Sequence, residues 1–116
     1  MAIGLALPKR IYAGLVPNSQ TLAYTVPANI RTIVTSMTVV NRTAQQRQVY
    51  LWIVPNGESE TDDQWAYLYD FDIGGNELVQ MTSLSEVLEE GAEIWIEASL
   101  PNVFNLRVNG TETEVA

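Results

Sequence analysis

Apolar and polar residues alternate with a period of two along much of this chain, most regularly in residues 33–40. In a strand, odd-numbered positions of that segment face one side and even-numbered positions the other. β-Branched and aromatic residues fill such runs, and Asn, Gly and Pro residues separate one run from the next. This combination is typical of half-buried antiparallel strands.

The pattern predicts about eight strands, spaced roughly 8–12 residues apart. They cover residues 11–16, 20–25, 33–40, 49–54, 63–73, 78–82, 94–98 and 103–108, and Asn109-Gly110 closes the last of them. We therefore expect an all-β fold, a single antiparallel β-sandwich of the jelly-roll or immunoglobulin-like type. Residues 83–91 fit either one helical turn after a capping box or a further extended segment, and we expect the extended one because so short a helix is unstable alone.

The first eight residues are predicted to stand apart from the sandwich. Ile3, Leu5 and Leu7 alternate, and Pro8 interrupts regular strand pairing. We expect an extended N-terminal arm over residues 1–8, able to add as a strand to its own subunit or to a neighbour. Residues 9–116 then form one β-sandwich domain, which is the size expected for a single core.

Composition argues against catalysis. The chain contains no Cys and no His, which excludes disulfides, thiol nucleophiles, the usual zinc sites and the commonest general base. The carboxylate pair Asp70/Asp72 could share a strand face, as could Glu93/Glu97, but no nucleophile and base accompany them. We expect no enzyme activity, no cofactor and no metal. The apolar runs are too short for a membrane helix, and the apolar start lacks the basic residues of a signal peptide.

Charge is divided unequally along the chain, whose net charge is −8. Residues 1–57 contain five basic residues and no acidic residue, whereas residues 58–116 contain all 14 acidic residues and one arginine. An acidic chain without a dense basic stripe is a poor partner for nucleic acid. The division favours solubility with local neutralisation, and it also allows a head-to-tail contact between like subunits.

Two segments are candidate binding sites. Four carboxylates lie within residues 57–64, enough oxygen ligands for a hard cation, but the spacing of an EF-hand loop is missing and we expect a solvated acidic loop. The second candidate is an aromatic stripe along one face of the strand predicted at 63–73. It consists of Trp65, Tyr67, Tyr69, Phe71 and Ile73, opposite Ala66, Leu68, Asp70 and Asp72.

Large aromatic rings at alternating positions need to be covered. We expect Phe71 and Ile73 to lie in the core between the sheets, and we expect Trp52 and Trp95, which lie within other strands, to pack in the core as well. Trp65, Tyr67 and Tyr69 are then left for a subunit contact, which we favour, or for a sugar-stacking platform.

Several strand–turn motifs resemble those of small β-sandwich proteins encoded among bacteriophage structural genes. The resemblance covers most of residues 9–110, and its motifs lie at 9–14, 22–29, 39–43, 49–57, 70–77 and 90–94. This chain has Gly74-Gly75 where the family usually has Pro-Ala, and at 90–94 the acidic residue follows glycine less directly.

The resemblance implies a virion structural protein that binds statically and transforms no substrate. The expected role is a capsid decoration (cement) protein, with a neck, tail or fibre component or a carbohydrate-binding module as the alternative. Expected partners are further copies of the chain, a trimer being favoured, and the major capsid or tail protein. The expected contact residues are Ile3, Leu5, Leu7, Trp65, Tyr67 and Tyr69, and the expected location is the virion.

Overall fold

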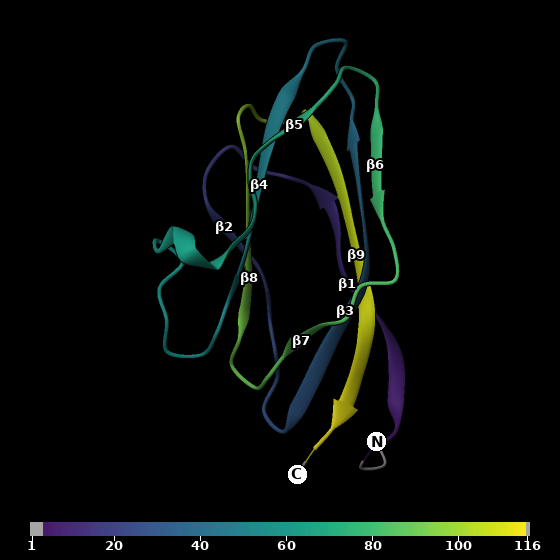
Figure 1. The fold of residues 1–116 in the computed structure, drawn as a ribbon, viewed down its shortest axis with the longest axis vertical. Helices are drawn as coiled ribbons and strands as arrows, with labels where there is room; N and C mark the ends of the chain where they lie inside the picture. Colours follow the sequence, from purple (N-terminus) through teal and green to yellow (C-terminus); the bar gives the residue numbers. More distant parts are fainter. Residues whose placement is uncertain (1–3, 116) are drawn as a thin grey trace.

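Two antiparallel sheets pack face to face in the computed structural model, which describes residues 4–115 (Figure 1). The strands are β1 (Ala6–Leu15), β2 (Thr21–Thr25), β3 (Ile30–Asn41), β4 (Arg47–Val54), β5 (Ala66–Ile73), β6 (Leu78–Met81), β7 (Glu86–Leu88), β8 (Glu93–Ala98) and β9 (Phe104–Glu114), and a 3-10 helix, η1 (Asp63–Trp65), precedes β5. The predicted all-β sandwich is thereby confirmed.

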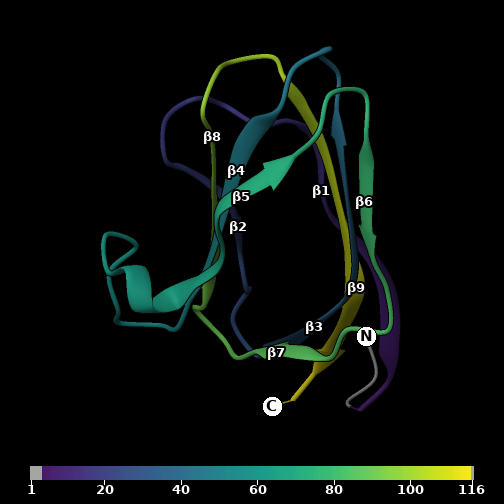
Figure 2. The ribbon, with the colours of Figure 1, turned by 45° about the horizontal axis from the view of Figure 1, so that its top comes forward.

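The first sheet has the order β1-β9-β3-β6, and the second has the order β2-β8-β4-β5. Strand β7 also pairs with β3, at Thr32–Val34, whereas β6 pairs with β3 further along, at Met37–Val40. Figure 2 shows β7 running across one end of the sandwich, from the side of β8 to the side of β6. The outer edges of the terminal strands, β1 and β6 in the first sheet and β2 and β5 in the second, have no neighbour among the described residues.

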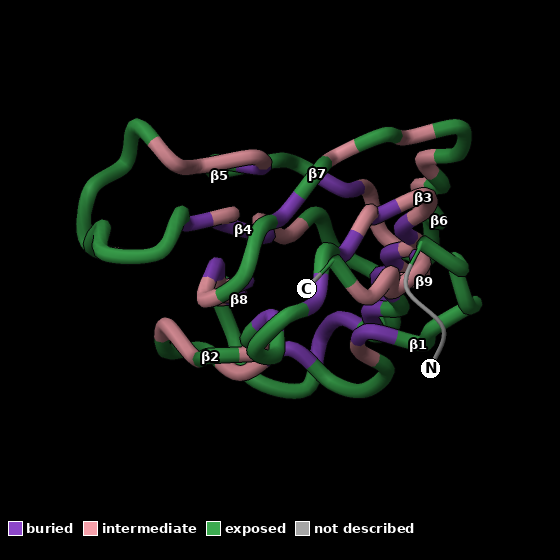
Figure 3. Tube along the Cα trace, turned by 90° about the horizontal axis from the view of Figure 1, so that it is seen from below, coloured by how far each residue is buried: buried purple, intermediate pink, exposed green. Residues whose placement is uncertain are grey.

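The core lies between the sheets and is made of every second residue of most strands (Figure 3). In β8, for example, Ile94, Ile96 and Ala98 are buried while the residues between them are half-exposed. The same alternation runs through β9, where Phe104, Leu106 and Val108 are buried. Because side chains of a strand point alternately to opposite faces, these residues fill the space between the sheets and their neighbours form the outer faces.

The segment 83–91 is extended, as predicted, and contains β7. The predicted end of the last strand is wrong, because β9 continues through Asn109-Gly110 to Glu114. Gly110 does not mark a turn. It lies beside the carbonyl oxygen of Ile33 on β3, which a Cβ atom would overlap, and the β3–β9 register shifts there. The glycine thus permits a close approach of two strands.

The predicted boundary between an N-terminal arm over 1–8 and the sandwich is also corrected, although residues 6–8 do add as a strand to their own subunit, one of the two predicted arrangements. Residues 6–8 belong to β1 and pair with β9, Ala6 opposite Thr113 and Pro8 opposite Thr111. Even the amide of Gly4 donates to the carbonyl of Glu114, at 3.0 Å. Pro8 is tolerated because β1 is an edge strand, so a position that lacks an N–H group can face outward. The described part of the sandwich therefore begins before residue 9.

The aromatic stripe on β5 is interrupted. Leu68 and Ile73 are both buried, five positions apart, so they cannot belong to one regular alternation. Between them Asp70 has a φ of 48°, and the pairing with β4 shifts register. This β-bulge turns the side chains of the strand. As a result Phe71 and Ile73, both beyond the bulge, share the face of the buried Val49. Ile73 is buried there as predicted, whereas Phe71, predicted to be buried, is 37% exposed on this edge strand.

Candidate functional site

The outer face of the second sheet carries a cluster of aromatic residues from β4 and β5. Tyr50 lies between the buried Val49 and Leu51, so its ring points away from the core. Trp52 follows on the same outer face and pairs with Trp95 of β8. Trp52 is buried as predicted, at 4% exposed, although it lies on the outer face and outside the main core cluster, whereas Trp95 is half-exposed.

Trp52 is buried because the loop after β4 folds back over it. The indole Nε1 donates to Oδ1 of Asp63 at 3.4 Å, and the amide side chain of Gln20 donates to the backbone oxygen of Glu60 at 2.6 Å. Asp62 caps η1 by accepting from the amide of Gln64. The acidic loop is thus tied both to the sheet and to the segment before β2.

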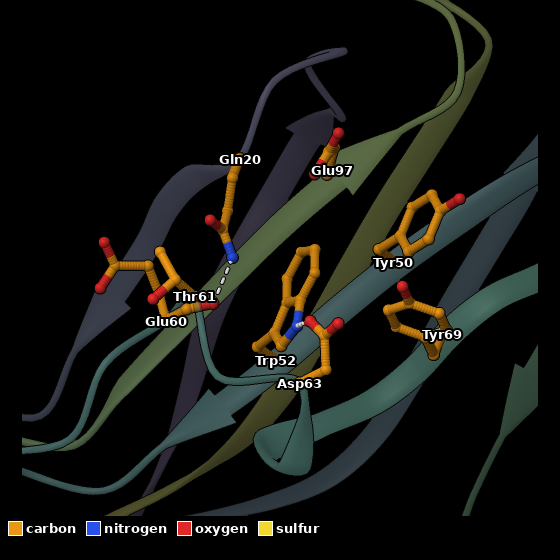
Figure 4. A pocket seen from close by; sticks show the side chains of 8 residues that line it. All are labelled: Gln20, Tyr50, Trp52, Glu60, Thr61, Asp63, Tyr69 and Glu97. Carbon is orange, nitrogen blue, oxygen red and sulfur yellow. Dashed lines mark hydrogen bonds between the residues drawn. The ribbon is translucent and has the colours of Figure 1, made fainter.

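Between this loop and the sheet lies a groove of about 390 Å³, which we call the aromatic groove (Figure 4). Its lining residues are Gln20, Tyr50, Trp52, Glu60, Thr61, Asp63, Tyr69 and Glu97. Figure 4 shows that they come from five places in the chain, with the ring of Trp52 at the centre and the rings of Tyr50 and Tyr69 side by side. The volume falls in the range of small-molecule and side-chain pockets.

The three rings form a corner. Tyr50 and Trp52 are nearly parallel, with 9° between their planes and 5.9 Å between their centroids. Tyr69 meets Tyr50 edge to face, at 85° and 5.4 Å. Tyr69 is 57% exposed, so a ligand in the groove has an open ring beside it as well as the outer edges of the other two.

The charge of the groove is negative. Asp63 and Glu97 line it, Asp70 accepts a hydrogen bond from the hydroxyl of Tyr50 at 3.0 Å, and none of its lining residues is basic. The charge of Asp63, together with some burial, raises the pKa of Tyr69. Burial and the bond to Asp70 raise the pKa of Tyr50. Burial and the nearby carboxylates both disfavour a negative charge on these tyrosine hydroxyls.

The groove is not organised as a metal centre. Within residues 4–115, no group of three or more Asp, Glu, His or Cys side chains is placed to hold a metal ion. The hydroxyls of Ser59 and Thr61 bond to each other at 2.7 Å, which orders the loop without gathering its carboxylates. The arrangement therefore suits binding through rings and charge.

The six residues predicted for contacts do not form one surface. Leu5 and Leu7 are exposed at the β1 edge of the first sheet, and Ile3 lies outside the described residues. Of these predicted residues, only Tyr69 lines the aromatic groove. Trp65 and Tyr67 are half-buried outside it, and Tyr67 packs on the core. The prediction missed Tyr50 and Trp52. The sequence did contain a signal for them: Tyr50 and Trp52 alternate with the apolar Val49 and Leu51, which places the two aromatic side chains on the outer face if Val49 and Leu51 face the core.

A second surface feature is the position of the exposed aliphatic side chains. Most of them lie on strands at the edges of the sheets: Leu7 and Leu15 on β1, Leu22 on β2, Leu78 on β6 and Val87 on β7. Leu78 and Val87 are more than half exposed, at 56% and 53%. Soluble proteins usually protect sheet edges with proline or charged residues. Such residues are present on β1 and β7 but absent from β2 and β6, so the β2 and β6 edges suit further strand contacts.

No protein-family model, curated protein or solved structure matches the chain. Among residues 4–115 there is no helix of the length and apolarity needed to cross a membrane.

Proposed function

We propose that this chain is a structural protein of a bacteriophage virion that acts by static binding, most specifically as a capsid decoration protein. The observation that carries the proposal is the concentration of exposed aliphatic residues on edge strands. Strands β2 and β6 contain no charged residue at all. The resemblance of the strand–turn motifs at 22–29 and 49–57 to phage structural proteins supplies the biological setting.

The mechanism follows from these edges. A strand edge offers backbone N–H and C=O groups to another strand, and apolar side chains beside it add about 25 cal/mol for each Å² removed from water. One such contact is weak. On a shell or tube that repeats the same site many times, and with several copies joined, the contacts reinforce one another. The same reasoning applies to a neck, tail or fibre component, so the choice of layer depends on the partner, the major capsid or tail protein.

A carbohydrate-binding module, for example in a fibre that recognises a host, is the second candidate. The observation that favours it is the exposed ring of Tyr69 beside the carboxylates of the aromatic groove. A sugar ring stacks its C–H face on an aromatic ring and donates its hydroxyls to carboxylates.

The test of the virion role is incorporation into particles. We expect mass spectrometry of purified particles from the phage that encodes this chain to detect it in many copies. We also expect its gene to lie beside capsid or tail genes. Absence of the chain from the particles would remove the virion role.

A paired substitution tests the edge mechanism. Replacing Leu78 by Asp places a charge on the β6 edge and removes an apolar contact, so we expect incorporation to fall at least about tenfold. Gln80→Asp is the matched control, because Gln80 is also exposed on β6 and gains the same charge. Incorporation of Leu78→Asp at the native level would exclude the β6 edge as the contact, and an equal loss in both variants would assign the effect to the added charge alone.

A further inference from the structure

The two outer faces of the sandwich carry opposite charge. On the first sheet Arg10, Arg31 and Arg107 are exposed. Arg107 lies between the buried Leu106 and Val108, and therefore points outward. Arg31 forms an ion pair with Glu89 at 2.9 Å. The residues paired with Arg10 and Arg107 across the strands are uncharged: Asn109 opposite Arg10, and Ala13 and Thr38 opposite Arg107.

The second sheet presents acidic residues on its outer face. Glu93 and Glu97 alternate with buried residues of β8 and so point outward. Asp70 and Asp72 are exposed on β5, where they bond to outward side chains of β4, Tyr50 and Gln48. The loop that contains Asp63 adds to the same side. Basic residues, which predominate in the first half of the sequence, thus lie mainly on the first sheet, and several acidic residues of the second half lie on the outer face of the second sheet.

The aromatic groove is suited to a cation. Tyr69 offers an open aromatic ring, and Asp63 and Glu97 offer charged acceptors beside it. A planar guanidinium can stack on such a ring and bond to a carboxylate at the same time. An anionic ligand would be repelled, and a neutral sugar would leave the charge of the groove uncompensated.

Arg107 is the cation best placed to reach such a groove. Its exposed side chain lies at a shallow depression of the first sheet that is lined in part by Ala13, Val40 and Leu78. The single ion pair among the described residues joins Arg31 to Glu89, so it does not occupy Arg107. An arginine on a partly apolar surface matches an aromatic groove rimmed by acids, in chemistry and in sign.

We propose that the aromatic groove binds the Arg107 guanidinium of a second copy of this chain, so that the outer face of the first sheet docks on the outer face of the second. Such a contact is heterologous, because each copy uses a different face. It leads to a ring if the rotation between copies closes and to an open stack if it does not. The inference is independent of the virion role and concerns the isolated protein.

The test uses two variants that each block one face. Glu97→Arg places a positive charge in the groove, and Arg107→Glu places a negative charge on the opposite face. In sedimentation velocity at low salt we expect the native protein to form oligomers whose size grows with concentration and falls as NaCl is added. Each variant alone should be a monomer, with association weakened at least about tenfold.

Mixing the two variants gives the decisive result. The Glu97→Arg protein keeps its first-sheet face and the Arg107→Glu protein keeps its groove, so the mixture should form dimers that grow no further. Formation of dimers by either variant alone, or no association in the mixture, would overturn the proposal. A native protein that stays monomeric at low salt would overturn it as well, and unchanged circular dichroism shows that each variant is folded.

The contribution of the rings is tested separately. We expect Tyr69→Ala to weaken association about tenfold, whereas Phe71→Ala, an exposed ring on the same strand outside the groove, should leave it unchanged. Galactose and N-acetylglucosamine serve as neutral probes in saturation-transfer NMR. A signal from either sugar that Tyr69→Ala abolishes, in a protein that does not self-associate, would assign the groove to carbohydrate and refute the protein contact.

Discussion

Asn41 shows how one buried polar residue can hold a turn in place. Its side-chain amide, in a residue that is 1% exposed, donates to the backbone oxygens of Gln45 and Ile73 at 2.8 and 2.9 Å. Its side-chain oxygen accepts from the backbone amide and the hydroxyl of Thr43. All four bonds are local or cross to the end of β5, so Asn41 joins the β3–β4 turn to the second sheet.

We predict that Asn41→Ala lowers the free energy of unfolding by about 2–3 kcal/mol, because it leaves buried backbone groups without partners. Urea denaturation followed by tryptophan fluorescence measures the change. Asn18→Ala is the control, since Asn18 is exposed, and should change stability by less than about 0.5 kcal/mol. An equal effect of both substitutions would contradict the role assigned to Asn41.

Tyr24 links the two sheets at the other end of the sandwich. Its hydroxyl donates to Glu112 on β9 at 2.6 Å and lies 2.7 Å from the hydroxyl of Thr32, which therefore acts as the donor. Burial and the bond to Glu112 raise the pKa of Tyr24 well above its ordinary value of 10.0. The folded state thus keeps the proton that the unfolded state loses near pH 10.

The stability contributed by this tyrosine is fully present below pH 10 and is lost as pH rises above that value, because the unfolded chain then binds fewer protons. We predict that stability falls with pH above 10 and falls less steeply in Tyr24→Phe. Denaturation midpoints measured at several pH values from 8 upward test this. An unchanged slope in Tyr24→Phe would contradict the assignment.

At the scale of elements, the interiors of strands could be predicted from local sequence patterns, whereas the ends of strands depend on pairing with other strands. The interiors of β3, β4 and β8 show their alternation within a few residues, so the sequence predicted them. The pairing of residues 6–8 with β9 joins segments about a hundred residues apart, and no local pattern encodes it. The bulge at Asp70 likewise arises from register against β4, which is why the prediction of a continuous stripe failed.

Gly110 offers a test of the corrected end of β9. A Cβ atom at this position would overlap the backbone of Ile33 and the end of the Ile11 side chain. We predict that Gly110→Ala lowers the free energy of unfolding by about 1–3 kcal/mol through overpacking and weakens hydrogen-exchange protection at the β3–β9 contact. Thr111→Ala, the next residue on the strand, is the control. Native protection in Gly110→Ala would show that Gly110 lies in a turn after all.

At the scale of the whole molecule, basic, acidic and apolar exposed residues lie on different parts of the surface. Basic residues of β1, β3 and β9 lie on one outer face, and acidic residues of β5, β8 and the 55–65 loop lie on the other. Exposed aliphatic residues remain at the edges. A molecule with two opposite faces and open edges can contact neighbours in more than one direction, which a component of a repeated assembly requires.

The candidate site illustrates the same division between sequence and structure. Of the residues predicted for contacts, only Tyr69 lines the aromatic groove. Tyr50 and Glu97 come from paired strands nearly fifty residues apart in the chain, and Gln20 reaches the groove through a bond to the acidic loop. The sequence showed that aromatic residues and carboxylates were abundant after residue 49, but it did not show which of them meet.

The amino-acid sequence alone determined the fold class, the number of strands to within one, most turns and the absence of Cys and His chemistry, because each of these depends on residue type and on spacing over a few positions. Only the tertiary structure decided the strand order, the edges, the place of both tryptophans and the aromatic groove. These features depend on register between distant strands, and a shift of one residue in register exchanges the core face for the outer face.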